Sequence, residues 1–333
     1  MKPASGWSRG ALLCLLVLVA ASQSRADDVA NYPVRPIHVI VPFAPGGATD
    51  FAIRLIQPDL SQTLGQPIVV DNKAGAAGNV GMEVAAQAAP DGYTLFFGNV
   101  GTVSINPHFF PELKTKPERD FIPISLVSET PGILIASKKF PPNSLKDMIA
   151  YAKAHPGKIN YAASGISTLN TLAMEQFRRT AGLEMTQIPY KGGAGPAILD
   201  LIAGNVDVML VTMSAAASHV KAGQLKAFAV TTRERVDLLP EVSTLAELGF
   251  PEDVSSSWQG LFVVKGTPPQ IVIKLHAAVA KALADPNVRK HMSDAGTLAT
   301  SSVSPENFKE FLAAESMKWT RVVEQVKAAE KTK

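Results

Sequence analysis

Loops rich in glycine, serine and threonine carry the residue types in this chain that suit the binding of a small anion. Three of them, residues 42–50, 163–168 and 190–194, each stand between an expected strand and an expected helix. A fourth, residues 98–102, also follows an expected strand. Helix N-termini offer free peptide N–H groups and a partial positive charge, which attract carboxylate or phosphate. Together the loops indicate an anion site, although each alone is equally compatible with a tight turn.

Signatures of catalysis are missing. The run Gly165-Ile166-Ser167-Thr168-Leu169 lacks the second glycine of a G-x-S-x-G nucleophile turn. Gly157-Lys158 is followed by isoleucine and has no spaced glycine before it, so it is not a Walker A loop. The six histidines show no metal-ligand spacing, and no pair of carboxylates stands out for acid–base work. We therefore predict no catalytic residue, no metal and no cofactor.

The N-terminus has the pattern of a secretory signal peptide. Lys2 and Arg9 precede an apolar run at 11–21, and small residues stand at −3 and −1 of a cut after Ala26. The run is too short for the roughly 20 residues that span a bilayer. We predict that residues 1–26 are removed and that the mature protein is periplasmic.

Removal of this leader changes what the charge implies. The full chain has 32 Lys and Arg against 29 Asp and Glu, but three of the basic residues lie in the leader, which leaves 29 of each sign. A neutral mature chain gives no reason to expect nucleic-acid binding. The single cysteine, Cys14, also lies in the leader, so the mature chain has no disulfide and no thiol nucleophile.

Short apolar runs alternate with helical periodicity along most of the chain. Strands are expected at 37–41, 68–70, 94–97, 159–162, 185–189, 206–211, 225–230 and 260–264. Helical segments separate them, and Pro305 opens a last amphipathic helix. Alternation of this kind predicts an α/β fold with parallel sheets covered on both faces. About ten strands in some 300 residues favour two α/β lobes over one barrel.

An ordered set of motifs resembles the Bug periplasmic receptors of tripartite tricarboxylate transporters (TctC-like proteins). It opens with Tyr32-Pro33 before Arg35-Pro36-Ile37, followed by Val41-Pro42-Phe43-Ala44-Pro45-Gly46-Gly47-Ala48-Thr49-Asp50. The set continues with Gly65-Gln66-Pro67, Ala74-Gly75-Ala76-Ala77-Gly78-Asn79, Pro90-Asp91-Gly92-Tyr93-Thr94-Leu95, Pro156-Gly157-Lys158, Ile188-Pro189-Tyr190-Lys191-Gly192, Gly204-Asn205-Val206-Asp207 and Gly266-Thr267-Pro268. No single motif is unique, but their order over essentially the whole mature chain is specific.

The resemblance implies a two-lobed type II periplasmic-binding-protein (Venus flytrap) fold that closes on a ligand between its lobes. We expect lobe 1 at 27–128 plus 253–333 and lobe 2 at 129–252, with crossings near 126–133 and 253–258. Family members grip a ligand carboxylate between one loop of each lobe. The ligand-binding residues predicted here are Phe43, Ala44, Gly46, Gly47, Ala48, Thr49, Asn99, Thr102, Ser164, Gly165, Ser167, Thr168, Tyr190 and Thr212. Asp50 is expected to cap its helix rather than to contact the anion.

Two departures from the family pattern bear on the ligand. Many members carry Asp-Asn after the strand at 206–210, where this chain has Val211-Thr212, so an acidic partner for a ligand amino or hydroxyl group is missing. Asn170 stands where a histidine is common. We therefore expect a less polar distal end on the ligand, as in an aromatic or alkyl acid. The residues expected to face that end are Phe43, Val211, Met213 and Trp258.

The leading interpretation is a monomeric, non-enzymatic receptor that delivers an organic carboxylate to the membrane permease subunits of a tripartite transporter. A second interpretation is a receptor of the same fold that signals to a sensor kinase. A third, a secreted hydrolase, rests only on the hydroxyl cluster at 164–168 and lacks a paired base.

Overall fold

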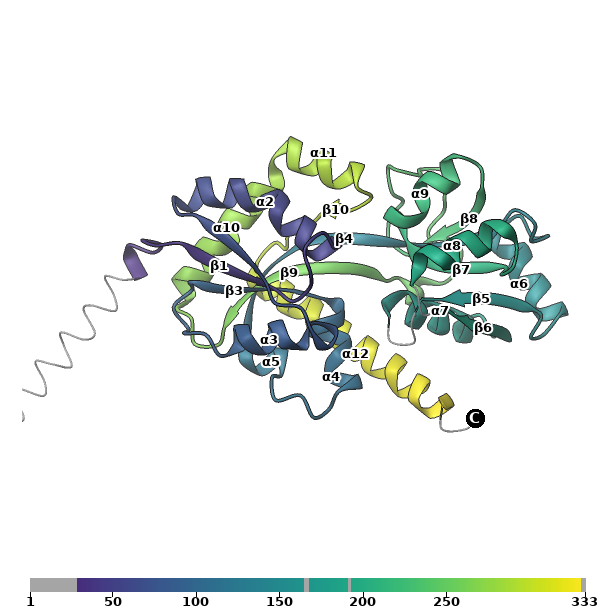
Figure 1. Cartoon of the computed structure of the whole chain (residues 1–333), viewed down its shortest axis with the longest axis horizontal. Coiled ribbons are helices and arrows are strands. Elements are labelled where there is room, and N and C mark those ends of the chain that lie inside the picture. The colour runs from purple at the N-terminus through teal and green to yellow at the C-terminus, as the bar shows by residue number, and fades with distance from the viewer. Residues whose placement is uncertain (1–28, 165–167, 191–192, 331–333) are drawn as a thin grey trace, which may run out of the picture.

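The computed structural model describes residues 29–164, 168–190 and 193–330 as two α/β lobes joined side by side by long strands (Figure 1). The predicted leader, and with it the cleavage after Ala26, lies outside the described residues. The strands are β1 (Ile37–Val41), β2 (Ile68–Asn72), β3 (Thr94–Asn99), β4 (Phe121–Ser137), β5 (Ile159–Ala163), β6 (Met185–Pro189), β7 (Val208–Thr212), β8 (Leu225–Val230), β9 (Ser256–Val264) and β10 (Leu298–Ala299).

Helices follow most of these strands. They are α2 (Ala48–Leu64), α3 (Asn79–Ala86), α4 (Asn106–Phe109), α5 (Pro117–Asp120), α6 (Leu145–Ala154), α7 (Leu169–Thr180), α8 (Ala194–Ala203), α9 (Met213–Lys221), α10 (Pro269–Ala284), α11 (Pro286–Asp294) and α12 (Pro305–Glu330), with short turns η1 (Ala76–Gly78), η2 (Gly101–Ile105) and η3 (Pro251–Asp253). No helix in the described ranges is long and apolar enough to cross a membrane.

Each lobe is built on a mixed sheet. In lobe 1, β1 lies parallel to β2 and β3, and β9 runs antiparallel to β3. In lobe 2, β5 lies parallel to β6 and β7. The expected parallel pairing is therefore present within each lobe, but β4, β8 and β9 pair antiparallel.

Strand β4 connects the two sheets. Residues 121–131 pair with β9 in lobe 1, whereas Gly132 to Ser137 pair with β7 and β8 in lobe 2. The change of partner falls between Pro131 and Gly132, inside the segment 126–133 where the first crossing was predicted. The second crossing runs through η3 into β9, where Ser256 pairs with Pro131.

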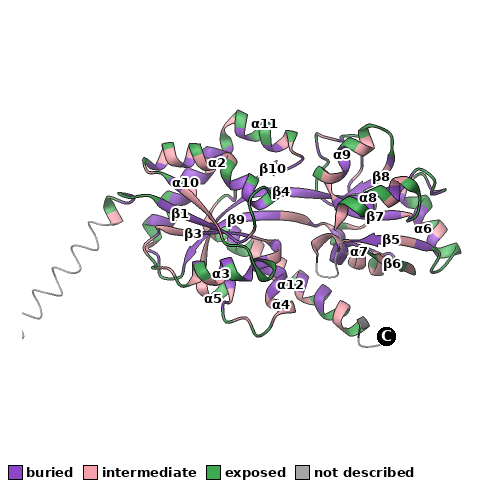
Figure 2. Cartoon of the chain, in the orientation of Figure 1, coloured by how far each residue is buried: buried purple, intermediate pink, exposed green. Residues whose placement is uncertain are grey.

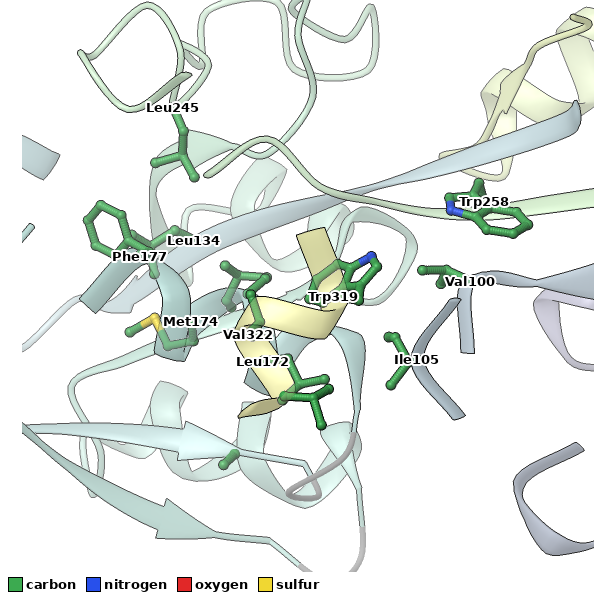
Figure 3. Packing of buried hydrophobic residues seen from close by; sticks show 14 of the residues in the cluster. Val100, Ile105, Leu134, Leu172, Met174, Phe177, Leu245, Trp258, Trp319 and Val322 are labelled. Atoms are coloured by element: carbon green, nitrogen blue, oxygen red, sulfur yellow. The ribbon is translucent and has the colours of Figure 1, made fainter. Parts of the chain in front are cut away.

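Helix α12 contacts both lobes. It packs on β4, η2 and α10 of lobe 1 and also on α7 of lobe 2. One hydrophobic cluster contains residues of α12 and of both lobes. In it, Trp319 and Val322 of α12 lie between two groups of side chains (Figure 3). On one side are Phe177 and Leu172 of α7, and on the other is Val100, next to η2. The strands at the centre of both lobes are buried while the outer helix faces are exposed (Figure 2). The C-terminal helix, expected in lobe 1, therefore bridges the lobes.

Gly260 in β9 leaves room for an aromatic ring. A Cβ atom placed there would lie 2.3 Å from Cζ of Phe308 and 3.2 Å from the oxygen of Ser125. Because Phe308 is fully buried on α12, its ring has little freedom to retreat. We expect Gly260→Ala to lower the free energy of unfolding in urea by about 1–3 kcal/mol. A suitable control is Gly195→Ala in α8, where a Cβ meets nothing within 4 Å; it should be neutral or slightly stabilising.

Candidate functional site

Three hydrogen bonds fix the loop between β1 and α2 to neighbouring residues of the same protein. Lys73 N donates to Val41 O at 2.8 Å, and Asn72 Nδ2 donates to Phe43 O at 2.9 Å. Gly46 N donates to Asp50 Oδ2 at 2.9 Å. Gly46 has a φ of +89°, a conformation that suits glycine. The loop therefore has a defined shape although residues 44–48 are exposed.

The first turn of α2 presents free donors at the end of this loop. The helix begins with Gly47 as N-cap, in an extended conformation and without a side-chain cap. In the described part of the chain, the N–H groups of Ala48 and Thr49 have no acceptor, and the Thr49 hydroxyl makes no hydrogen bond. Thr49 is itself buried, whereas Ala48 is exposed. Unsatisfied N–H groups at a helix start suit an anion.

Three loops of lobe 1 meet beside Phe43. A Cβ on Gly78 would lie 2.5 Å from Cγ2 of Thr102 and 3.1 Å from Cζ of Phe43, so the turn at 75–78 touches both. Asn99 and Thr102 bond to each other: Thr102 N donates to Asn99 Oδ1 at 2.9 Å, and Asn99 N donates to Thr102 Oγ1 at 3.1 Å. These loops enclose one side of Phe43 and limit where its ring can move.

The predicted residues of lobe 2 follow parallel strands that end at one edge of the sheet. Ser164 comes directly after β5, Tyr190 after β6, and Thr212 closes β7. Tyr190 N donates to Ala163 O at 2.8 Å, which places the two loops side by side. Thr168 is the N-cap of α7 and accepts from Thr171 N. The carboxyl edge of such a sheet is where open α/β proteins bind ligands.

Comparison with known proteins agrees with this arrangement. The family described as the tripartite tricarboxylate transporter family receptor (TctC) matches residues 52–328. The protein BugT of Bordetella pertussis is 35% identical over 320 residues, which cover 95% of this chain and 98% of BugT. The chain belongs to the TctC receptor family.

Solved TctC-type structures share the fold. MatC from Rhodopseudomonas palustris with bound malate has 36% identity and a TM-score of 0.69, over 88% of this chain and 100% of MatC. A second R. palustris protein, solved with adipate, has 32% identity and a TM-score of 0.73, over 89% of this chain and 98% of its own. The predicted family and two-lobed fold are therefore confirmed. TctC proteins are solute-binding receptors, which also confirms that the chain is not an enzyme.

Several polar groups predicted to meet the ligand in this TctC chain have other partners. Thr102 is fully buried and its hydroxyl bonds to Asn99, so it supports Asn99 instead of reaching an anion. The Thr168 hydroxyl caps α7. The Tyr190 hydroxyl donates to Asp200 Oδ2 at 2.7 Å, and burial together with that carboxylate raises the pKa of Tyr190 to about 12. Gly165 and Ser167 lie outside the described residues.

Three of the four residues expected at the apolar end of the ligand are core residues. Val211, Met213 and Trp258 are all at most 1% exposed. The Trp258 ring packs against Phe308 and its Nε1 donates to Glu315 Oε2 at 2.9 Å, on the side of β9 that faces α12. The prediction that these three residues line a ligand is wrong, because their apolar side chains fill the lobe interiors. Phe43, half-buried, stays available.

The turn at 75–79 is a feature whose part in the site was not anticipated. Ala76 and Ala77 have φ values of +46° and +56°, which are unfavourable for alanine. Asn106 stabilises the turn by donating to Ala77 O at 3.0 Å and to Asn79 Oδ1 at 2.8 Å. Strained backbone of this kind is common in ligand clamps. The Gly75-Ala-Ala-Gly78-Asn79 run was its only sequence signal.

A cavity of about 1050 Å³ lies away from these loops, between α7, α12 and η3. It contains none of the predicted ligand residues. Four basic and four acidic side chains line it, so it shows no preference for an anion. Its basic residues are Arg179, Arg233, Lys318 and Arg321, and its acidic ones Glu129, Glu234, Glu252 and Glu315. Nowhere in the described ranges do three or more His, Asp or Glu side chains gather as metal ligands.

Proposed function

We propose that this protein captures a small organic carboxylate between its lobes and delivers it to the membrane subunits of a tripartite transporter. The observation that carries the proposal is the start of α2, where an anchored, exposed loop presents free peptide N–H groups. Relatives of the same family are solved with malate and adipate, both carboxylates. Periplasmic export through the leader at 1–26 fits this role.

In the proposed complex the carboxylate accepts from the α2 N-terminus on lobe 1 and from the loop at 164–168 on lobe 2. Hydrogen bonds to a charged group contribute about 1.5–3 kcal/mol each. A helix terminus adds about 0.3–1 kcal/mol, and up to roughly 2 where it is partly buried. Three or four such contacts reach the ~8 kcal/mol of micromolar binding before closure costs are subtracted. No arginine clamp is required.

The finer ligand class is an acid with a weakly polar distal end. This class depends on two features: Phe43 is half-buried in the loop, and Val211 stands where the family resemblance places an aspartate. Without that carboxylate an ammonium group on the ligand has no counter-charge after β7. Aromatic and alkyl acids are therefore favoured over amino acids.

Ala48→Pro tests whether the α2 N-terminus holds the anion. Proline is well accepted at the first helical position, and Gly47 before it is already extended, so only one peptide N–H is lost. We expect the affinity for the best carboxylate to fall at least tenfold, because one hydrogen bond to a charged group is removed. Isothermal titration of refolded residues 27–333, after a thermal-shift screen of dicarboxylates, aromatic acids and amino acids, measures it.

Ala48→Ser is the matched control, because it changes the side chain at the same position and keeps the N–H. It should bind within twofold of the wild type. Equal binding by Ala48→Pro and Ala48→Ser would show that the α2 terminus does not hold the ligand. A folded wild type that binds no acid in the screen would contradict the proposed function, and best binding of aspartate would contradict the weakly polar class.

A further inference from the structure

Behind the exposed face of the β1–α2 loop lies a closed ring of three side chains. Asp50, 3% exposed, accepts from Arg54 Nε at 2.9 Å and from Asn72 Nδ2 at 2.9 Å. Arg54 also donates to Asn72 Oδ1 at 3.0 Å. Each side chain therefore bonds to both others, although Asn72 is 22 residues from Asp50 and lies on a different element.

The same ring bonds to the backbone at both ends of the loop. Asn72 Nδ2 reaches Phe43 O, just after β1, and Asp50 Oδ2 accepts from Gly46 N, just before α2. Asn72 is held in place because it ends β2 directly beside Val41, the last residue of β1. The ring thus uses the carbonyl of Phe43 and the N–H of Gly46, while the N–H groups of Ala48 and Thr49 are left free.

We propose that Asp50 and Asn72 are positioning residues that hold this loop in its ligand-binding shape before the ligand arrives. The inference rests on the proposed function, since it assigns these residues to the same carboxylate site. An untethered loop with two glycines would lose conformational entropy on binding, and this loss would subtract from affinity. Tethering in the free protein removes most of that cost.

Arg54 compensates the negative charge of Asp50 next to the proposed anion site. Asp50 lies in the first turn of α2, close to the proposed anion, and a bare negative charge there would repel a carboxylate. Arg54, one turn later, forms an ion pair with Asp50 at 2.9 Å, and Asp50 Oδ1 also accepts from Asn72. The charge is thereby neutralised within the ring, and the N–H groups of Ala48 and Thr49 stay free.

Asn72→Ala is the principal test. It removes the tie to Phe43 without touching the proposed ligand contacts, and we expect carboxylate affinity to fall about tenfold. The backbone amides of Phe43, Ala44, Gly46 and Gly47 should exchange hydrogen faster in the ligand-free variant, while those of α2 beyond Arg54 keep their protection. If Asn72 served only overall stability, hydrogen exchange would become faster throughout α2 and by the same factor in the loop. Asp50→Asn, which keeps the shape but loses the charge, should show the same effects in weaker form.

Gln57→Ala is the matched control. Gln57 Nε2 donates to Ile68 O at 2.6 Å, a side-chain tie between the same helix and the same strand, but at the opposite end. We expect it to affect stability as Asn72→Ala does, yet to bind within twofold of the wild type.

The outcomes separate the two proposals. Unchanged affinity and unchanged loop exchange in both Asn72→Ala and Asp50→Asn would overturn the positioning role and leave the proposed function standing. If the wild type binds no carboxylate, the proposed function fails, and loop exchange in Asn72→Ala still decides whether the ring fixes the loop.

Discussion

Replacing Trp319 by alanine should lower the free energy of unfolding by about 3–5 kcal/mol, the largest effect of any substitution considered for this protein. Trp319 is fully buried at the middle of α12 and its Nε1 donates to Glu315 Oε2 at 2.9 Å. Its ring lies where α12 meets both η2 of lobe 1 and α7 of lobe 2 (Figure 3). The variant leaves a cavity at a helix that both lobes share.

The place of Trp319 between the lobes also bears on how cooperatively the protein unfolds. A hydrophobic cluster that includes Phe262 of lobe 1 and Phe177 of lobe 2 is continuous through α12, so the wild-type lobes should unfold in one transition in urea. Trp319→Ala should broaden or split that transition, since it weakens the shared part of the core. Fluorescence and circular dichroism, recorded together, will measure this.

Two variants on the same helix calibrate the result. Met317→Ala removes a side chain that is 60% exposed and should change stability by less than about 0.5 kcal/mol. Trp319→Phe keeps much of the volume and should lose less than Trp319→Ala, because Glu315 retains the bond from Trp258 Nε1. A loss below 1 kcal/mol for Trp319→Ala would mean that α12 does not hold the lobes together.

Local patterns predicted most strands and the start of α2 well. The expected strand at 37–41 matches β1, and the glycine pair at 46–47 does precede a helix. These features depend on side-chain periodicity and on backbone freedom within a few residues, which a sequence displays directly.

Strand β4, in contrast, was not predicted at all. It contains Pro123 and Pro131, and proline normally argues against a strand inside a sheet. The structure accommodates Pro123 beside an irregularity in pairing with β9, where the register shifts between Pro123 and Ser125. Such a shift depends on the partner strand, more than 120 residues away, so local patterns carry no sign of it.

The contacts that support the site could not be predicted from local sequence patterns either. Asp50 was expected to cap α2, but the N-cap is Gly47 without a side-chain cap, and Asp50 instead accepts from the N–H of Gly46, just before the helix. Its bond to Asn72 joins two elements that only the folded sheet brings together. Likewise, Trp258 looked available to a ligand until its burial against α12 was known, because alternate residues of a strand face opposite sides.

Asp253→Asn should remove much of the pH dependence of stability between pH 4 and pH 7. Asp253 ends η3, where the chain crosses between the lobes, and is 3% exposed. Its Oδ1 accepts from Thr180 Oγ1 at a long 3.3 Å, and its Oδ2 has no hydrogen-bond partner in the described part of the chain. Burial raises the pKa of Asp253 from 3.8 to about 6, even though the nearby Lys318 acts to lower it.

The sign follows from the raised pKa. Between about pH 4 and 6 the folded protein binds more protons at Asp253 than the unfolded chain does. The contribution of Asp253 to the stability of the wild type is therefore greatest below pH 4. It is lost as the pH rises through about 6. A shift from 3.8 to about 6 corresponds to about 3 kcal/mol at most. Asp253→Asn, which stays neutral, should therefore be more stable than the wild type at pH 7.5 and lose this advantage at pH 4.

Urea unfolding at pH 4, 5, 6 and 7.5 measures the difference between the two proteins, which cancels the titration of all other groups to first order. Asp237→Asn changes an exposed carboxylate of lobe 2 and serves as the control; its stability should run parallel to that of the wild type across this range. A difference between Asp253→Asn and the wild type that stays constant with pH would show that the Asp253 carboxyl titrates normally. The crossing into β9 would then contain no buried charge that opposes folding at neutral pH.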